Sequence, residues 1–187
     1  MNYKIILSHY YPEATKLRDI LFTHSRLVAD LALECASKHP ELKLDLSVIE
    51  AGAMLHDIGI MRCNAPGIEC YGTEPYICHG TLGAAMLRND HDLFHLTAEE
   101  IEPFARICER HTGTGLTREQ IISQDLPLPH KDFIPETLEE QIICYADKFF
   151  SKTHPDRRKT IDHALRSMEK FGNDGVVRLK EWHEMFA

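Results

Sequence analysis

The chain has 187 residues and a mass of 21.5 kDa, a length that suits one domain burying roughly 70% of its unfolded surface. Its apolar and charged fractions are ordinary for a globular protein, and no apolar run approaches the roughly 20 residues that a membrane span needs. The net charge of −8 argues against a duplex nucleic-acid partner, because such partners are held by clustered lysines and arginines. A small phosphorylated ligand remains compatible with this charge.

The start of the chain lacks the long apolar region and small-residue cleavage site of a secretory signal, which favours a cytoplasmic location. The six cysteines contain no C-x-x-C pair and are typical of reduced thiols that fill a core. The unusual count is 12 histidines. Histidine is the commonest protein ligand of metals, so the histidine positions need attention.

The first predicted helix covers residues 13–38. Apolar residues recur there every three and four positions between Pro12 and Pro40, and His24 lies within this apolar stripe. A second, short helix is predicted to begin at a capping-box pattern, Ser47 to Glu50, and to end in a left-handed Gly59.

Residues 62–78 carry glycines and prolines without a period and are predicted to form a covering loop. A third helix is expected over His79–Arg88. The pattern Thr97 to Glu100 predicts the cap of a further helix, which has His111 on its inward face and stops at Gly113.

The remaining chain reads as a short helix from Thr117, an irregular bridge over 125–135, and a helix from Thr137 through Lys152 that carries Asp147. Two C-terminal helices are predicted by two sets of apolar positions: Ile161, Leu165, Met168 and Phe171, then Val176, Leu179, Trp182 and Met185. No strand pattern is evident. We therefore expect an all-α single domain spanning 1–187, with a metal-binding helical core at about 13–152 and C-terminal helices at about 157–186.

Several polar side chains fall on inward helix faces or crowd their ends. They are His24, His56, Asp57, His79, His111 and Asp147. Each of them alone is most often a hydrogen-bonded core residue. Together they indicate a shared cation, since a buried imidazole or carboxylate is costly without a partner. A set of N and O donors without thiolate favours iron, manganese, cobalt, nickel or zinc.

The adjacent pair His56-Asp57 is the most informative part of this set. Neighbouring residues on a helix diverge by about 100°, so the two side chains can approach one ion from different sides. The second carboxylate oxygen of Asp57 is then available to another ion.

The order of His24, the His56-Asp57-Ile-Gly motif, His79, His111 and Asp147 resembles the HD-domain superfamily, whose central motif is HDIG. The passage PETLEEQIICYAD further resembles a branch of single-domain HDIG proteins. The resemblance implies an HD-domain helical bundle in which His24, His56, Asp57 and Asp147 hold one divalent metal. In dinuclear members, residues at the positions of His79 and His111 hold a second metal, and the carboxylate at Asp57 bridges. Iron is then the first expectation, with manganese, cobalt, nickel, zinc or magnesium as alternatives.

One position departs from the family pattern. Many dinuclear members place a lysine three residues beyond the motif aspartate to hold a substrate phosphate, and here that residue is Ile60. Arg62, Arg110 and Lys148 are the predicted substrate-binding residues, on the ground of their sequence neighbours; Arg26 is a further candidate. The alternative for each is an ordinary solvated surface charge.

The leading functional hypothesis is a metal-dependent phosphohydrolase acting on a nucleotide or another small phosphate ester, with water as the nucleophile. His56, Asp57 and Lys148 are its predicted catalytic residues. Two alternatives remain open: a mixed-valence di-iron oxygenase with the same six ligands, and a non-catalytic metal- or nucleotide-binding regulator. The complete ligand set argues against the regulator, whereas Ile60 weakens both enzyme hypotheses.

Overall fold

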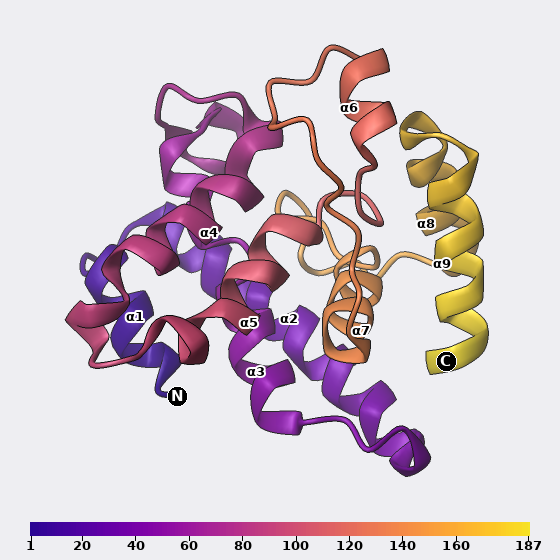
Figure 1. Ribbon diagram of the computed structural model, residues 1–187, viewed down its shortest axis with the longest axis horizontal. Helices are drawn as coiled ribbons and strands as arrows, with labels where there is room; N and C mark the ends of the chain where they lie inside the picture. The colour runs from indigo at the N-terminus through magenta and orange to yellow at the C-terminus, as the bar shows by residue number, and fades with distance from the viewer.

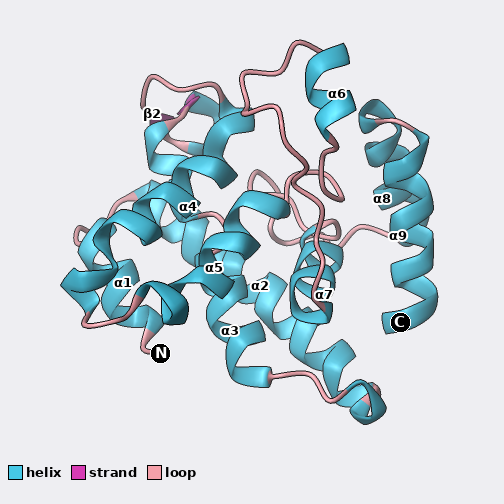
Figure 2. Cartoon of the chain, in the orientation of Figure 1, coloured by secondary structure: helices cyan, strands magenta, loops and turns pink.

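The structure is a computed structural model that describes the backbone of residues 1–187 and every side chain except that of Phe171. The inward position predicted for Phe171 therefore lies outside the described residues. The chain is all-α, as predicted (Figure 2). In the described residues, the paired strands are limited to a two-residue antiparallel hairpin, β1 (Asn64–Ala65) with β2 (Cys70–Tyr71).

The α-helices follow one another from the N-terminus to the C-terminus (Figure 1). They are α1 (Tyr3–Tyr10), α2 (Lys16–Lys38), α3 (Leu46–Leu55), α4 (His79–Asp90), α5 (Ala98–Arg110), α6 (Arg118–Ser123), α7 (Leu138–Asp147), α8 (Ile161–Met168) and α9 (Asn173–Phe186). The 3-10 turns are η1 (Pro40–Leu42), η2 (Ile58–Arg62), η3 (Pro66–Ile68), η4 (Tyr76–Cys78), η5 (His91–Phe94) and η6 (Glu169–Phe171).

Helices α2, α3, α5 and α7 pack against one another, and α4 lies on α5 and η2. Fully buried aliphatic residues such as Leu21, Ile49 and Ile143 fill the space between them, and each contributes about 1.5 to 3 kcal/mol by leaving water. The C-terminal α9 packs on α7 and α8, on the side of the molecule away from α1 (Figure 1). None of the described helices combines the length and the apolarity that crossing a membrane requires.

Local capping explains where several helices begin. The side-chain oxygens of Thr97, Thr117 and Thr137 each accept a hydrogen bond from the backbone amide three residues later. The Glu or Gln side chain at that later position accepts a hydrogen bond from the backbone amide of the threonine. The predicted cap at Ser47 is wrong. Asp45 caps α3 instead, because its Oδ1 accepts from the amides of both Ser47 and Val48, at 2.9 and 3.1 Å.

Two boundaries differ from the prediction. The helix expected to begin at residue 13 starts at Lys16, after its cap Thr15. The helix expected to run through Lys152 ends at Asp147, and the next three side chains, Lys148 to Phe150, are all buried. Three consecutive helix positions span about 200° of a helix surface, so burying all three is easier once the chain has left the helix.

The prediction that Gly59 ends a helix in the left-handed conformation is wrong. Gly59 lies within η2 and has no positive φ. Its role is close packing: a Cβ there would lie 2.2 Å from the carbonyl oxygen of His79 and 2.4 Å from the amide nitrogen of Gly83. The backbone of α4 therefore lies directly against the His56-Asp57-Ile-Gly motif, called the HD motif below. This contact brings His79 beside Asp57.

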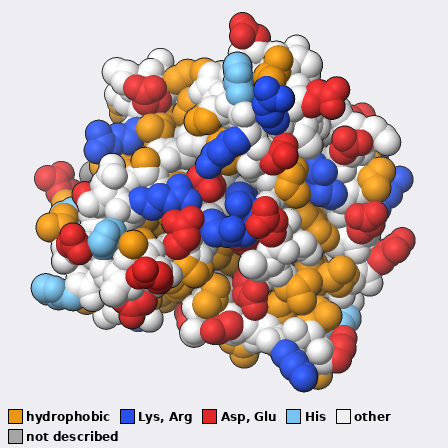
Figure 3. Space-filling view, viewed as in Figure 1, with side chains coloured by type: hydrophobic (Ala, Val, Ile, Leu, Met, Phe, Trp, Pro, Cys, Tyr) orange, Lys and Arg blue, Asp and Glu red, His pale blue; other side chains and the backbone are white. Residues whose placement is uncertain are grey.

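Surface charges are interspersed. On the face seen in Figure 3, lysine and arginine side chains lie among acidic ones. Arg88 pairs with Glu102 and Glu109, at 2.7 and 2.8 Å. Such arginines are neutralised by acidic neighbours.

Candidate metal centre

The six predicted ligand residues converge from five helices. His24 lies within α2, His56 and Asp57 follow α3, and His79 begins α4. His111 follows α5, and Asp147 is the last residue of α7. The four histidines and Asp57 are at most 5% exposed, and the Asp147 side chain is 13% exposed. The site is therefore built at helix ends inside the bundle.

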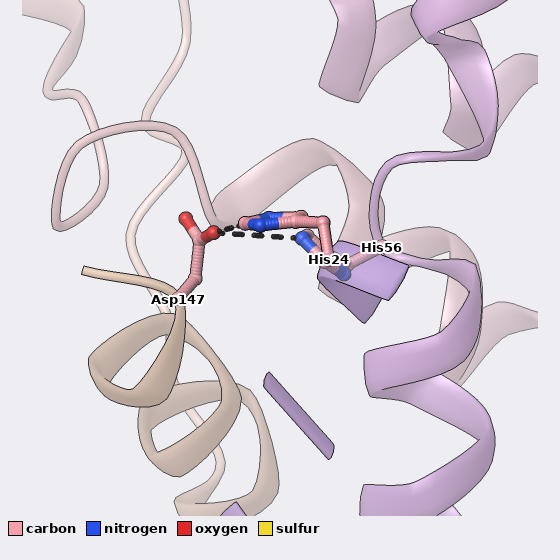
Figure 4. A group of neighbouring side chains, drawn as sticks. All are labelled: His24, His56 and Asp147. Carbon is pink, nitrogen blue, oxygen red and sulfur yellow. Dashed lines mark hydrogen bonds and ion pairs between the residues drawn. The ribbon is translucent and has the colours of Figure 1, made fainter. Parts of the chain in front are cut away.

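The first group joins His24, His56, Asp57 and Asp147. Nε2 of His24 lies 2.9 Å from Oδ1 of Asp147 and 3.3 Å from Oδ2 of Asp57. Nε2 of His56 lies 3.0 Å from the same Asp57 oxygen and 3.6 Å from the same Asp147 oxygen. Figure 4 shows His24 and His56 both facing Asp147. Donors that share one ion at roughly 2.0 to 2.2 Å lie about 3 to 3.6 Å apart, so His24, His56 and Asp147 could hold a metal, with Oδ2 of Asp57 beside them.

The second group uses the other oxygen of Asp57. Oδ1 of Asp57 lies 3.4 Å from Nε2 of His79 and 3.4 Å from Nε2 of His111. The two histidine Nε2 atoms are 2.9 Å apart. Oδ2 of Asp57 therefore belongs to the first group of metal donors, and Oδ1 belongs to the second group.

The ring orientation of three histidines follows from backbone carbonyls. Nδ1 of His56, His79 and His111 lies 2.6 to 2.7 Å from the carbonyl oxygen of the residue three positions earlier. A carbonyl only accepts, so Nδ1 carries the proton and Nε2 presents its lone pair to the cluster. Two lone pairs that face each other, as in His79 and His111, need a cation between them.

Several buried polar atoms at the cluster lack a hydrogen-bond partner. Nε2 of His56 and both carboxylate oxygens of Asp57 are among them. Such atoms in fully buried residues are costly, and a bound cation would satisfy Nε2 of His56 and Oδ1 of Asp57. Oδ2 of Asp57 already has the ammonium group of Lys152 beside it. The residues present therefore fit a divalent metal, with the N and O donors that iron, manganese, cobalt, nickel and zinc accept.

The protonation states of Asp57, His79 and His111 agree with this arrangement. Burial alone would raise the pKa of Asp57, but His56 and Lys152 hold it well below its usual range. Burial, together with the neighbouring His111, lowers the pKa of His79 to about 3, and burial also lowers the pKa of His111. The carboxylate is charged and the imidazoles of His79 and His111 are neutral, which is the state that metal binding requires. Burial opposes a charge on His56, but Asp57 and Asp147 raise its pKa to about 9, so a metal ion would displace a proton from Nε2 of His56.

The cluster forms part of the wall of a cavity of about 630 Å³. The described charged residues that line it are Lys148, Lys152, Lys159, Lys170 and Asp147. Four lysines in one cavity are notable in a chain of net charge −8. The cavity therefore favours an anionic ligand.

Lys148 and Lys152 each contact a carboxylate of the cluster. Nζ of Lys148 donates to Oδ2 of Asp147 at 2.7 Å and to the carbonyl oxygen of His111 at 3.0 Å. Nζ of Lys152 lies 2.5 Å from Oδ2 of Asp57. It also lies 6.0 Å from the ring centre of Tyr76, which stacks on His79.

Of the predicted substrate-binding residues, Lys148 lines the cavity. Lys152, Lys159 and Lys170 line it as well and were not among the predicted site residues. The sole sequence signal for Lys152 is its place five residues after Asp147. A lysine at position 60 would have no open space to enter, because Ile60 is fully buried in the apolar core.

The positions of the predicted arginines do not support substrate binding. Nη1 of Arg110 donates to the carbonyl oxygen of Ile134 and pairs with Glu136, both at 2.9 Å. Arg62 is exposed, and neither arginine lines the cavity. Arg26 also lies elsewhere, paired with Asp30 and Glu50.

The comparison with known families agrees with the geometry. The HD domain pattern matches residues 21–151. The chain belongs to the HD-domain family. The matched range includes all six residues of the cluster.

Solved structures share the fold of this HD-domain protein. The crystal structure of the HD domain of the L. monocytogenes phosphodiesterase PgpH in complex with cyclic-di-AMP has a TM-score of 0.54 at 19% identity, covering 98% of this chain and 85% of that one. A second structure of the same domain has a TM-score of 0.51 at 16% identity, covering 91% and 95%.

Three curated relatives are similar to this chain. An uncharacterized protein of Methanocaldococcus jannaschii is 36% identical, covering 79% of this chain and 74% of the relative. A tRNA (cytidine(56)-2'-O)-methyltransferase of Picrophilus torridus is 34% identical over 89% of this chain but only 41% of its own length. The same enzyme of Thermoplasma volcanium is 30% identical, covering 90% and 42%. The HD-domain chain thus spans about two fifths of the methyltransferases that it matches.

Proposed function

We propose that this HD-domain protein is a metal-dependent phosphohydrolase acting on a nucleotide or another small phosphate ester, with water as the nucleophile. One observation carries the proposal: the buried cluster around Asp57 opens into a cavity lined by four lysines. Bound metal ions and ammonium groups are all positively charged, so together they favour an anionic ligand. Phosphate esters are anions of this kind.

The proposed roles follow from the contacts. His24, His56, Asp57 and Asp147 would hold one ion, and His79 and His111 would hold a second through the other oxygen of Asp57. Such ions supply Lewis acidity to a phosphoryl group and acidify a water molecule.

The two inner lysines have different proposed roles. Lys148 holds the carboxylate of Asp147 and the backbone of His111 in place, so we assign it a positioning role instead of the predicted catalytic one. Lys152 lies in the cavity wall beside Asp57, where its ammonium can bind a phosphoryl oxygen. It thereby takes the role that Ile60 cannot fill.

The solved neighbour supports a nucleotide as substrate class, since it is a phosphodiesterase domain in complex with cyclic-di-AMP. The methyltransferase activity in the names of the other relatives is not part of the proposal. More than half of the length of each of those proteins lies outside the matched region.

The test is phosphate or nucleotide release from a panel of phosphate esters by metal-depleted protein, reloaded with manganese or cobalt, with and without air. We expect release with either ion, independent of dioxygen, and none after Asp57→Asn. The control Asp162→Asn, at an exposed position of α8, should retain activity. Turnover that strictly requires iron and consumes dioxygen would instead establish the oxygenase alternative.

A further inference from the structure

The four lysines of the cavity fall into two pairs. The inner pair, Lys148 and Lys152, already contacts the carboxylates of Asp147 and Asp57. The outer pair is Lys159 and Lys170. Both residues of the outer pair, like Lys152, lie beyond residue 151, where the family match ends.

Lys159 is a cation without a carboxylate partner. Its Nζ donates to the carbonyl oxygen of Phe150 at 3.4 Å, and no carboxylate of the described residues forms an ion pair with it. The side chain is only partly exposed, so solvent does not fully replace such a partner.

The surroundings of Lys159 disfavour its charge. Burial lowers the pKa of Lys159, and the positive charges of Lys148, Lys152 and Lys170 lower it further, against the opposing effect of Asp147. An anion placed between several cations offsets the electrostatic repulsion between them, so binding an anion would stabilise the charged form of Lys159.

The position of Lys159 does not depend on its side chain alone. The backbone amide of Lys159 donates to the carbonyl oxygen of Phe149 at 2.8 Å. Removal of the side chain leaves this bond in place. The ammonium group is therefore not needed merely to hold this segment against the turn that follows α7.

We propose that the substrate carries a second phosphoryl group, as a nucleoside diphosphate does, and that Lys159 binds this second group while Lys152 and the metal cluster face the first. This inference rests on the proposed function, whose substrate class it narrows. The cavity of about 630 Å³ lies within the range of roughly 300 to 1,000 Å³ of small-ligand sites. Ser151 and Ser167 also line the cavity.

The test compares two probes that differ by one phosphoryl group, adenosine monophosphate and α,β-methylene adenosine diphosphate, whose P–C–P bridge resists hydrolysis. Their dissociation constants are measured by calorimetry on the full chain loaded with manganese, with free manganese in excess. The variants are Lys159→Ala and the charge-retaining Lys159→Arg. Lys180→Ala, at an exposed position of α9 outside the cavity, is the matched control.

We expect Lys159→Ala to weaken binding of the diphosphate analogue about tenfold and that of the monophosphate by less than about twofold. Lys159→Arg and Lys180→Ala should bind both probes nearly as the unmodified chain does. Should the alanine variant melt early, Lys159→Gln takes its place. Equal weakening of both probes, no weakening of either, or no binding of the diphosphate analogue to the unmodified chain would overturn the inference.

This binding test separates the inference from the proposed function. Binding of the diphosphate analogue that depends on Lys159, in a protein that releases no phosphate, supports the second phosphoryl subsite and refutes the hydrolase. Hydrolysis of monoesters, with no difference between the probes in Lys159→Ala, supports the hydrolase and refutes the subsite.

Discussion

The ammonium group of Lys152 lies 2.5 Å from Oδ2 of Asp57, the same oxygen that faces His24 and His56. The carboxylate of the His56-Asp57 pair is therefore contacted by a lysine that lies one residue beyond the end of the family match. Lys152 belongs to the turn that follows α7, and it lines the cavity over the stacked rings of Tyr76 and His79.

Lys152→Met should reduce kcat/KM for a phosphate ester about 100-fold, because a charged donor to the phosphoryl group is lost. The metal content, measured by mass spectrometry, should stay unchanged, since the six proposed ligands remain. The exposed Lys180→Met is the control and should keep both values. Unchanged kcat/KM would contradict a role of Lys152 in substrate binding.

Gly59→Ala should destabilise the fold by about 2 to 3 kcal/mol, because a Cβ at this position collides with the backbone of His79 and Gly83. Urea denaturation measures this loss. The control is Gly67→Ala, where a Cβ meets nothing within 4 Å and the change should stay below about 0.5 kcal/mol. Equal stability of the two variants would show that α4 is not held closely against the HD motif.

Arg88→Ala should cost about 2 kcal/mol at neutral pH, since it leaves the buried Glu109 with only the weaker partner Lys131. The hydrogen bonds from Arg88 lower the pKa of Glu102. Burial alone would raise the pKa of Glu109, but the hydrogen bond and the charge of Arg88 lower it below its usual value of 4.5. Because the folded pKa lies below the unfolded one, this stabilisation is complete above about pH 4.5 and disappears as the pH falls through the folded values.

The difference in unfolding free energy between Arg88→Ala and the unmodified chain should therefore shrink from pH 7.5 to pH 3.5, as chemical denaturation can measure. Lys16→Ala removes the exposed pair with Glu69 and should change stability by less than about 0.5 kcal/mol at either pH. A constant difference for Arg88→Ala across this range would show that the two carboxylates are not responsible.

Much of the helical framework could be predicted because its signals are local. The three capping boxes that begin at Thr97, Thr117 and Thr137 depend on residues within one turn. The helix α1 was missed, because its buried Ile6 and Leu7 form too short an apolar patch to show a period. Its position depends on tertiary packing against α3.

The sequence order of the cluster residues was enough to predict that they lie close together. The lysines that line the cavity could not be predicted from their sequence neighbours. Arg110 was proposed for the cavity because it precedes His111, but neighbouring residues at a helix end diverge by about 100°, and Arg110 points to Glu136. Lys159 lies in an irregular segment of the sequence that is rich in charged residues. The path of the chain after Asp147 brings it to the cavity.

The metal content of the protein purified without chelator, measured by mass spectrometry for the unmodified chain and for a variant with His79→Ala and His111→Ala, tests the central claim most directly. The Asp57-centred cluster predicts about two equivalents of divalent metal per chain in the first and about one in the second. Fewer than about half an equivalent in the unmodified chain, or no difference between the two proteins, would contradict it.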